Sequence, residues 1–105
     1  MDTHNRIISH LTANWQVFEA TLTDVTFEES TWRPDPEHWS LIEIVCHLVD
    51  EETEDFRARV RHTLETPDQT MPQIHPQKWV AERQYQKQNF QTKLREFLEE
   101  RAKSI

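Results

Sequence analysis

The chain has 105 residues, no glycine and a formal net charge of −7. This length fits one domain, and the acidic balance disfavours binding to nucleic-acid phosphates. The lack of glycine argues against β-hairpins and Gly-rich nucleotide loops. The apolar fraction is only 35%, but four Trp and five Phe supply large apolar areas. We therefore expect a small helical domain with a thin, aromatic-rich core.

The first expected element is a helix over about residues 3–25. Apolar residues recur there at spacings of three and four, which is typical of a helix that packs into a bundle. They are Ile8, Leu11, Trp15, Phe18, Leu22 and Val25. Residues 26–39 break this pattern, because they include two prolines. We interpret them as a connection whose tryptophans, Trp32 and Trp39, fold back as a lid on the bundle.

A second helix is expected over about residues 40–66, and its start has the clearest signal. Ser40 is followed three residues later by Glu43, the spacing of a capping box. Pro67 ends the segment. Within it, the acidic stretch 50–55 occupies positions where an ordinary bundle helix would place apolar side chains.

A third helix is expected over about residues 79–104, starting between Trp79 and Gln84. A second proline-containing connection, residues 67–78, precedes it. Connections of this length indicate a larger bundle or loops that cover a pocket. The helical pattern continues to the last residues without a stop signal, as a truncated helix would.

His47 is the leading candidate for chemistry, because Glu43 and Glu51 lie one turn away on either side and Asp50 is close by. An imidazole next to carboxylates can form part of a metal site. The alternative is a half-buried histidine bonded to one of these glutamates, and spacing alone favours this alternative. No His pair at i, i+4 and no Glu-x-x-His motif supplies further ligands.

The other sequence features indicate a soluble, cytoplasmic protein. Cys46 is the only cysteine, so an internal disulfide is excluded, and a buried small hydrophobe is the simplest role for it. The first residues do not have the pattern of a signal peptide. The longest apolar runs are far too short to cross a membrane.

Several stretches together resemble the DinB/YfiT-like family. They are Trp32-Arg33-Pro34, the run from Glu37 through His38-Trp39-Ser40-Leu41-Ile42-Glu43-Ile44-Val45-Cys46-His47-Leu48-Val49-Asp50 to Glu52, and Pro72-Gln73-Ile74-His75-Pro76 before Trp79. The resemblance implies an all-α four-helix bundle, frequent dimers, and a zinc or nickel ion held by three histidines. It also implies, for some members, transfer of small-molecule thiols. Residue by residue it carries over one metal ligand, His47, with Asp50 or Glu51 as support or base.

The chain departs from this family at its C-terminal end. Members carry two further histidines in a His-x-x-x-His pattern on a fourth helix, and residues 1–105 contain no such pattern. We therefore expect a truncated domain, three helices of the bundle with an incomplete metal site, and a homodimer or other self-association through the exposed apolar edge. The expected function is that of a metal-dependent thiol transferase or hydrolase. The alternative is a non-catalytic helical dimerisation or interaction domain, so whether the chain is an enzyme stays open.

Overall fold

The computed structural model describes residues 2–70 and 73–105, and within them the chain is helical and contains no strand. The elements in chain order are α1 (Thr3–Leu22), α2 (Phe27–Thr31), α3 (Leu41–Glu51), the π-helical turn η1 (Glu52–Phe56), α4 (Arg57–Glu65), α5 (Pro76–Glu82), the 3₁₀ turn η2 (Tyr85–Lys87) and α6 (Phe90–Ser104). The expected all-α fold is confirmed. In the described part of the chain, no helix combines the length and apolar character needed to cross a bilayer.

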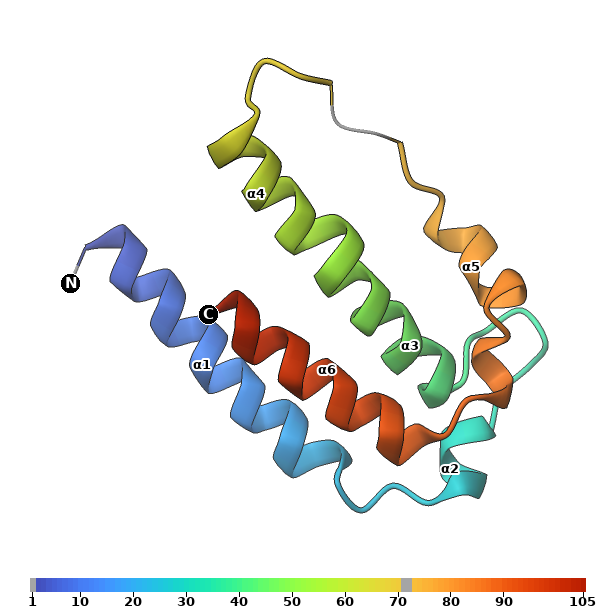
Figure 1. The fold of residues 1–105 in the computed structure, drawn as a ribbon. Helices are drawn as coiled ribbons and strands as arrows, with labels where there is room; N and C mark the ends of the chain where they lie inside the picture. Colours follow the sequence, from blue (N-terminus) through green and yellow to red (C-terminus); the bar gives the residue numbers. More distant parts are fainter. Residues whose placement is uncertain (1, 71–72) are drawn as a thin grey trace.

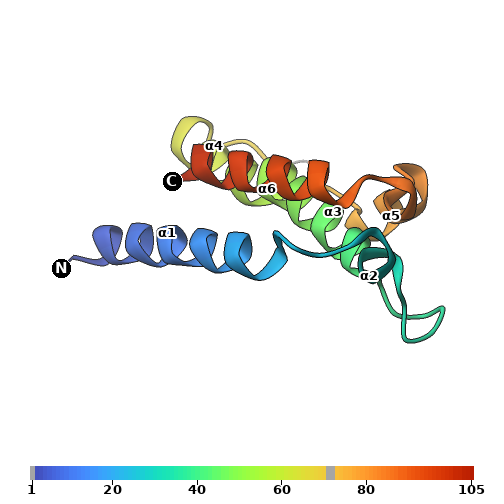
Figure 2. The same ribbon diagram turned by 90° about the horizontal axis from the view of Figure 1, so that it is seen from below.

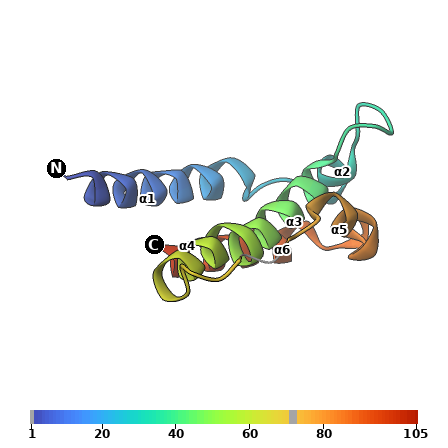
Figure 3. The same ribbon diagram turned by 90° about the horizontal axis from the view of Figure 1, so that it is seen from above.

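Three long helical segments make up the fold. Helix α6 lies between α1 and a rod formed by α3, η1 and α4 (Figure 1) and packs against both. The short elements α2, α5 and η2 gather at the end of the rod where α3 begins. Seen from below and from above, α1 stands apart from α3 and α4 over most of its length (Figures 2 and 3).

Side-chain caps fix where most of these helices begin. The predicted capping box is confirmed, because the Ser40 hydroxyl accepts from the Glu43 amide and the Glu43 carboxylate accepts from the Ser40 amide. A second capping box, between Thr26 and Glu29, starts α2 within a stretch that the sequence predicted to be only a connection. Asn89 caps α6, with its side-chain oxygen 2.9 Å from the Thr92 amide nitrogen.

The prediction of one helix over residues 79–104 is wrong. Helix α5 ends at Glu82, and Gln84 adopts a left-handed backbone conformation with φ of 50°. An α-helix of L-residues does not continue through such a residue. The chain turns there, forms η2 and begins α6 only at Phe90. This break lets the 3₁₀ turn place Tyr85 in the core.

The core is small and lies between the start of α3, α5, η2 and α6. One cluster holds most of it: Ile42, Val45, Cys46, Trp79, Tyr85, Phe90 and Leu94.

The predicted stripe of the first helix does face α6. The Phe18 and Phe97 rings meet edge to face at 5.0 Å, and the Trp15 indole donates to the Leu98 carbonyl at 2.7 Å. Every stripe residue is only half-buried, however, and α1 contains no buried residue.

The acidic interruption of the second helix has a structural explanation. Glu52, 3% exposed, lies 2.9 Å from Nε of Arg101 on α6. One turn later, Arg57 pairs with Glu100 at 2.6 Å. The π-helical turn carries one residue more than an α-helical turn, so it shifts the later apolar positions around the rod. Phe56 is therefore 42% exposed instead of joining the core.

The predicted tryptophan lid is only partly present. Trp32 is 67% exposed and does not fold back over the bundle. Trp39 is 37% exposed. Its ring packs against the ring of His47, with 5.0 Å between the ring centres.

Candidate functional site

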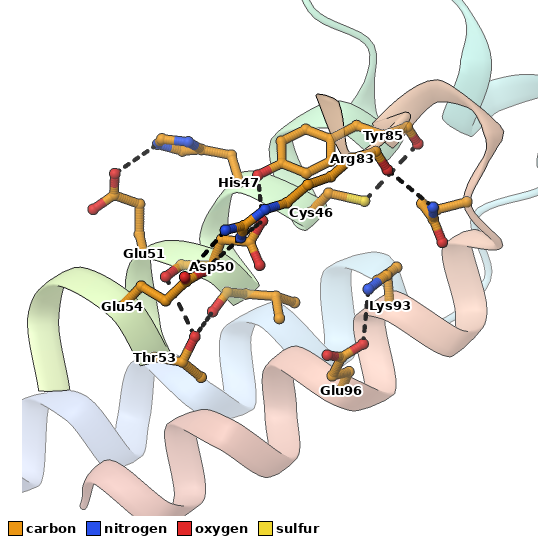
Figure 4. A network of polar contacts seen from close by, with 12 residues as sticks. Cys46, His47, Asp50, Glu51, Thr53, Glu54, Arg83, Tyr85, Lys93 and Glu96 are labelled. Atoms are coloured by element: carbon orange, nitrogen blue, oxygen red, sulfur yellow. Dashed lines mark hydrogen bonds and ion pairs between the residues drawn. The ribbon is translucent and has the colours of Figure 1, made fainter. Parts of the chain in front are cut away.

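His47 sits on α3, with its side chain 27% exposed. Its Nε2 lies 3.7 Å from an Oε1 of Glu51, which is longer than a hydrogen bond (Figure 4). Its Nδ1 is buried and has no hydrogen-bond partner in the described part of the chain. A buried polar atom without a partner is costly to a folded protein. The unpartnered Nδ1 therefore distinguishes His47 from the other buried polar side chains of the described chain.

The surroundings of His47 keep its ring neutral. Burial lowers the pKa of His47, and the nearby charges of Asp50 and Asp55 oppose this effect only in part. Burial, together with the hydrogen bond and charge of Asp55, raises the pKa of Glu51 to about 7. The pKa of Asp55 is in turn lowered by the Glu51 hydrogen bond and by Arg59. Near neutral pH, the site thus holds an imidazole with one ring nitrogen able to donate a lone pair, beside a carboxyl group that is partly protonated.

Asp50 belongs to a different network, on another side of α3. Its carboxylate accepts a hydrogen bond from the Tyr85 hydroxyl and lies 3.0 Å from Nη1 of Arg83 (Figure 4). The Arg83 guanidinium also donates twice to Glu54, at 2.5 and 3.1 Å, and stacks 4.2 Å from the Trp79 ring centre. Asp50 therefore helps to hold α5 and η2 against α3, and both of these contacts are made by one carboxylate oxygen, Oδ2.

Glu43, the other neighbour predicted for His47, is also engaged elsewhere. It is 2% exposed and forms a two-pronged contact with Arg33, with both N···O distances 2.9 Å. Ser40 donates to the Gln86 side chain at 2.6 Å, and that side chain donates to the Thr31 carbonyl at 2.9 Å. This network joins α2, α3 and η2. The glutamate of the capping box is thus structural.

Cys46 is not part of a site with His47. Its side chain is buried, and Sγ lies 3.9 Å from the Tyr85 carbonyl oxygen. Burial raises the pKa of this thiol to about 12. The expectation of a small buried residue agrees with this placement.

The donors around His47 do not complete a metal site. Over residues 2–70 and 73–105, no three His, Cys, Asp or Glu side chains are grouped so that they could hold an ion. His47 and Glu51 are a pair of neighbouring donors, whereas a catalytic zinc site usually takes three protein ligands. Two other histidines are bonded locally: His38 pairs with Asp35 at 2.8 Å, and Nε2 of His62 lies 2.5 Å from the Gln69 carbonyl oxygen.

Sequence reasoning missed Arg83, Tyr85 and Arg101, which bind the acids of the second helix. These partners lie 29 to 49 residues from the acids they contact, and no local spacing reveals them. The only signal was the acidic interruption itself. Buried acids on a bundle helix require cationic or hydroxyl partners from elsewhere in the chain.

These features define an all-helical protein whose long rod of α3, η1 and α4 carries one half-buried histidine with an unpartnered ring nitrogen. A comparison with protein families matches residues 10–105 to the DinB superfamily. The chain belongs to the DinB superfamily. Comparisons with curated proteins and with solved structures found no match. The matched residues include the whole of α2 to α6 and most of α1.

Proposed function

We propose that this chain is a metal-dependent protein of the thiol transferase or hydrolase class, and that His47 supplies one ligand of its zinc or nickel site. The observation that carries the proposal is the state of His47. Its ring is neutral, 27% exposed, and not within hydrogen-bond distance of its nearest carboxylate. Neutral imidazole is the form that binds metals. A bound divalent ion would lower the pKa of a thiol or water molecule, which both reaction classes require.

Glu51 is the second donor in this proposal, because it lies one turn from His47 with its side chain 25% exposed. Asp50 is not included, since Tyr85 and Arg83 both engage its Oδ2 and hold its carboxylate toward η2 and α5. Two donors make half of a ligand set. The remaining ligands have to come from outside the described donors, and a small-molecule thiol is one candidate.

The test measures zinc and nickel content by elemental mass spectrometry and affinity by calorimetry, on the wild type, His47→Ala and His4→Ala. His4 is an exposed histidine on α1, far along the chain from α3, so it is the matched control. We expect the wild type and His4→Ala to bind metal and His47→Ala to lose it. Equal metal binding by all three proteins, or none by the wild type, would overturn the proposal.

A second candidate function is a non-catalytic interaction domain. One observation favours it: α1, with twenty residues, contains no buried side chain, although five of its residues form a regular apolar stripe. A helix held on one side only is typical of a surface that packs against a partner. Under this candidate, His47→Ala leaves the association state unchanged.

A further inference from the structure

One hollow of the surface lies along α4, at the end of the rod opposite α2, α5 and η2 (Figure 1). It has a volume of about 390 Å³ and extends from Thr53 in η1 to Thr66, which follows the last residue of α4. This volume is within the range of about 300–1,000 Å³ found for small-molecule sites. At about 1.5 Å per residue, Arg61 in its lining lies about 20 Å along the rod from His47. The hollow is therefore separate from the candidate metal site.

Contacts to other parts of the chain hold the walls of the hollow in place. Arg57 donates to the carboxylate of Glu100 at 2.6 Å and to the backbone carbonyl of the same residue at 3.1 Å. At the other end, Nε2 of His62 lies 2.5 Å from the Gln69 carbonyl oxygen, and its Nδ1 lies 3.1 Å from the Thr66 hydroxyl. The guanidinium and the imidazole are thus ordered before a ligand arrives, which lowers the entropic cost of binding.

Two charged side chains of the lining, Arg61 and Glu65, have no partner. Both are exposed, and neither makes an ion pair or a side-chain hydrogen bond within residues 2–70 and 73–105. They are one helical turn apart, but the base precedes the acid, which is the less favourable order for a pair on a helix. The other arginine of the lining, Arg57, is neutralised by Glu100. The hollow therefore presents one available positive charge and one available negative charge side by side.

We propose that this hollow binds a free α-amino acid. The carboxylate of the ligand pairs with Arg61, because a guanidinium fork matches the two oxygens of a carboxylate. Its ammonium group pairs with Glu65, and the negative end of the α4 dipole adds to the attraction for a cation there. The rest of the hollow, beside Ala58 and Thr53, is left for the side chain of the ligand.

A ligand with a single charge fits this lining less well. A carboxylate on Arg61 is repelled by the charge of Glu65 one turn away, and an ammonium group on Glu65 is repelled by Arg61. Each such ligand leaves one charge of the lining unpaired, whereas an amino acid pairs both. The inference is independent of the metal proposal and of the interaction-domain candidate, since neither uses Arg61 or Glu65.

The test is a set of NMR titrations of the isotope-labelled chain with three probes of matched shape: L-norvaline, pentanoate and butylamine. Norvaline carries both charges, and each of the other two lacks one of them. We expect norvaline to shift the amide signals of residues 57–66. It should also bind at least about tenfold more tightly than either analogue, as expected for one additional contact between charged groups. Equal affinities for the three probes, or no binding of norvaline, would overturn the inference.

Three variants assign the two charges of the ligand to their partners. Arg61→Gln should remove the advantage of norvaline over butylamine, and Glu65→Gln should remove its advantage over pentanoate. Arg95→Gln is the control, because Arg95 is an exposed arginine on α6 outside the hollow, and it should bind norvaline as the wild type does. All three replaced side chains are exposed, so each variant should keep the fold, which circular dichroism verifies. Equal weakening by Arg61→Gln and Arg95→Gln indicates unspecific charge attraction and overturns the inference.

Discussion

The guanidinium of Arg101 lies 2.9 Å from the carboxylate of Glu52, and it reaches Asn14 at 3.2 Å with its second nitrogen. One arginine near the end of the chain thus connects the π-helical turn, α6 and α1. The pair is almost fully buried, with side-chain exposures of 15% for Arg101 and 3% for Glu52. Substitutions that remove this ion pair test how the three long helical segments are held together.

Glu52→Ala should destabilise the fold by about 3–5 kcal/mol, because it leaves a buried arginine without its counter-ion. Chemical denaturation in urea measures this loss. The double variant Glu52→Leu, Arg101→Met is the control, since replacing both charges by apolar groups of similar size is often neutral. Equal losses in the single and double variants would contradict this account of the pair.

Tyr85→Phe should lower stability by about 1–2 kcal/mol, because Asp50 loses a hydrogen bond in a largely buried network. Thermal unfolding followed by circular dichroism measures the change. Metal affinity should stay the same, since Asp50 serves to hold η2 and α5 in place. If Tyr85→Phe instead strengthens zinc binding, the carboxylate freed by the substitution is a ligand, and the structural role assigned to Asp50 is wrong.

Stability should fall in acid partly through Glu100. Hydrogen bonds from Arg57 and Lys103 lower the pKa of Glu100 below its ordinary value of 4.5. The folded state therefore binds this proton less tightly than the unfolded state does. The contribution is fully present above pH 4.5 and is lost as the pH falls through the lowered pKa of the folded state.

Urea titrations of the wild type and Glu100→Gln at several pH values measure this contribution. The difference should be at most about 1 kcal/mol at neutral pH, as for a partly exposed ion pair, and should vanish in acid. Glu99→Gln, a change at an exposed neighbour, is the control and should show no such dependence. A pH-independent difference for Glu100→Gln would contradict the assignment.

The thiol of Cys46 should react slowly in the folded protein. Burial raises its pKa from 9.0 to about 12, so the reactive thiolate is about a thousandfold scarcer at a given pH. Iodoacetamide labelling followed by mass spectrometry should be slower by at least this factor in native buffer than in urea. Native labelling within tenfold of the unfolded rate would show that the α3–η2 contact opens often.

Short-range patterns in the sequence correctly predicted the structural features that depend only on neighbouring residues. The apolar stripe of the first helix and the capping box at Ser40 follow from spacing alone, and both are present. The break at Gln84 was not predictable, because a glutamine has no preference for the left-handed region. The π-helical turn was also missed, since it depends on burying Glu52 against Arg101, forty-nine residues away.

The candidate site was predictable to a smaller extent. Spacing along one helix correctly brought His47 and Glu51 together, but it could not tell which acids were already engaged. Asp50 is adjacent to Glu51 in sequence, yet it points to Tyr85 and Arg83. The direction of each carboxylate is set by partners from α5 and η2, which no helical periodicity encodes.

The lack of glycine has a consequence for the unfolded chain. Gln84 is the only described non-glycine residue with a positive φ, and the chain accepts there a backbone conformation that costs about 1–2 kcal/mol. Glycine would relieve that cost, but it would also give the unfolded chain more conformations to lose on folding. A sequence without glycine begins folding from a more restricted ensemble. The small core of this protein therefore has less chain entropy to overcome than its size suggests.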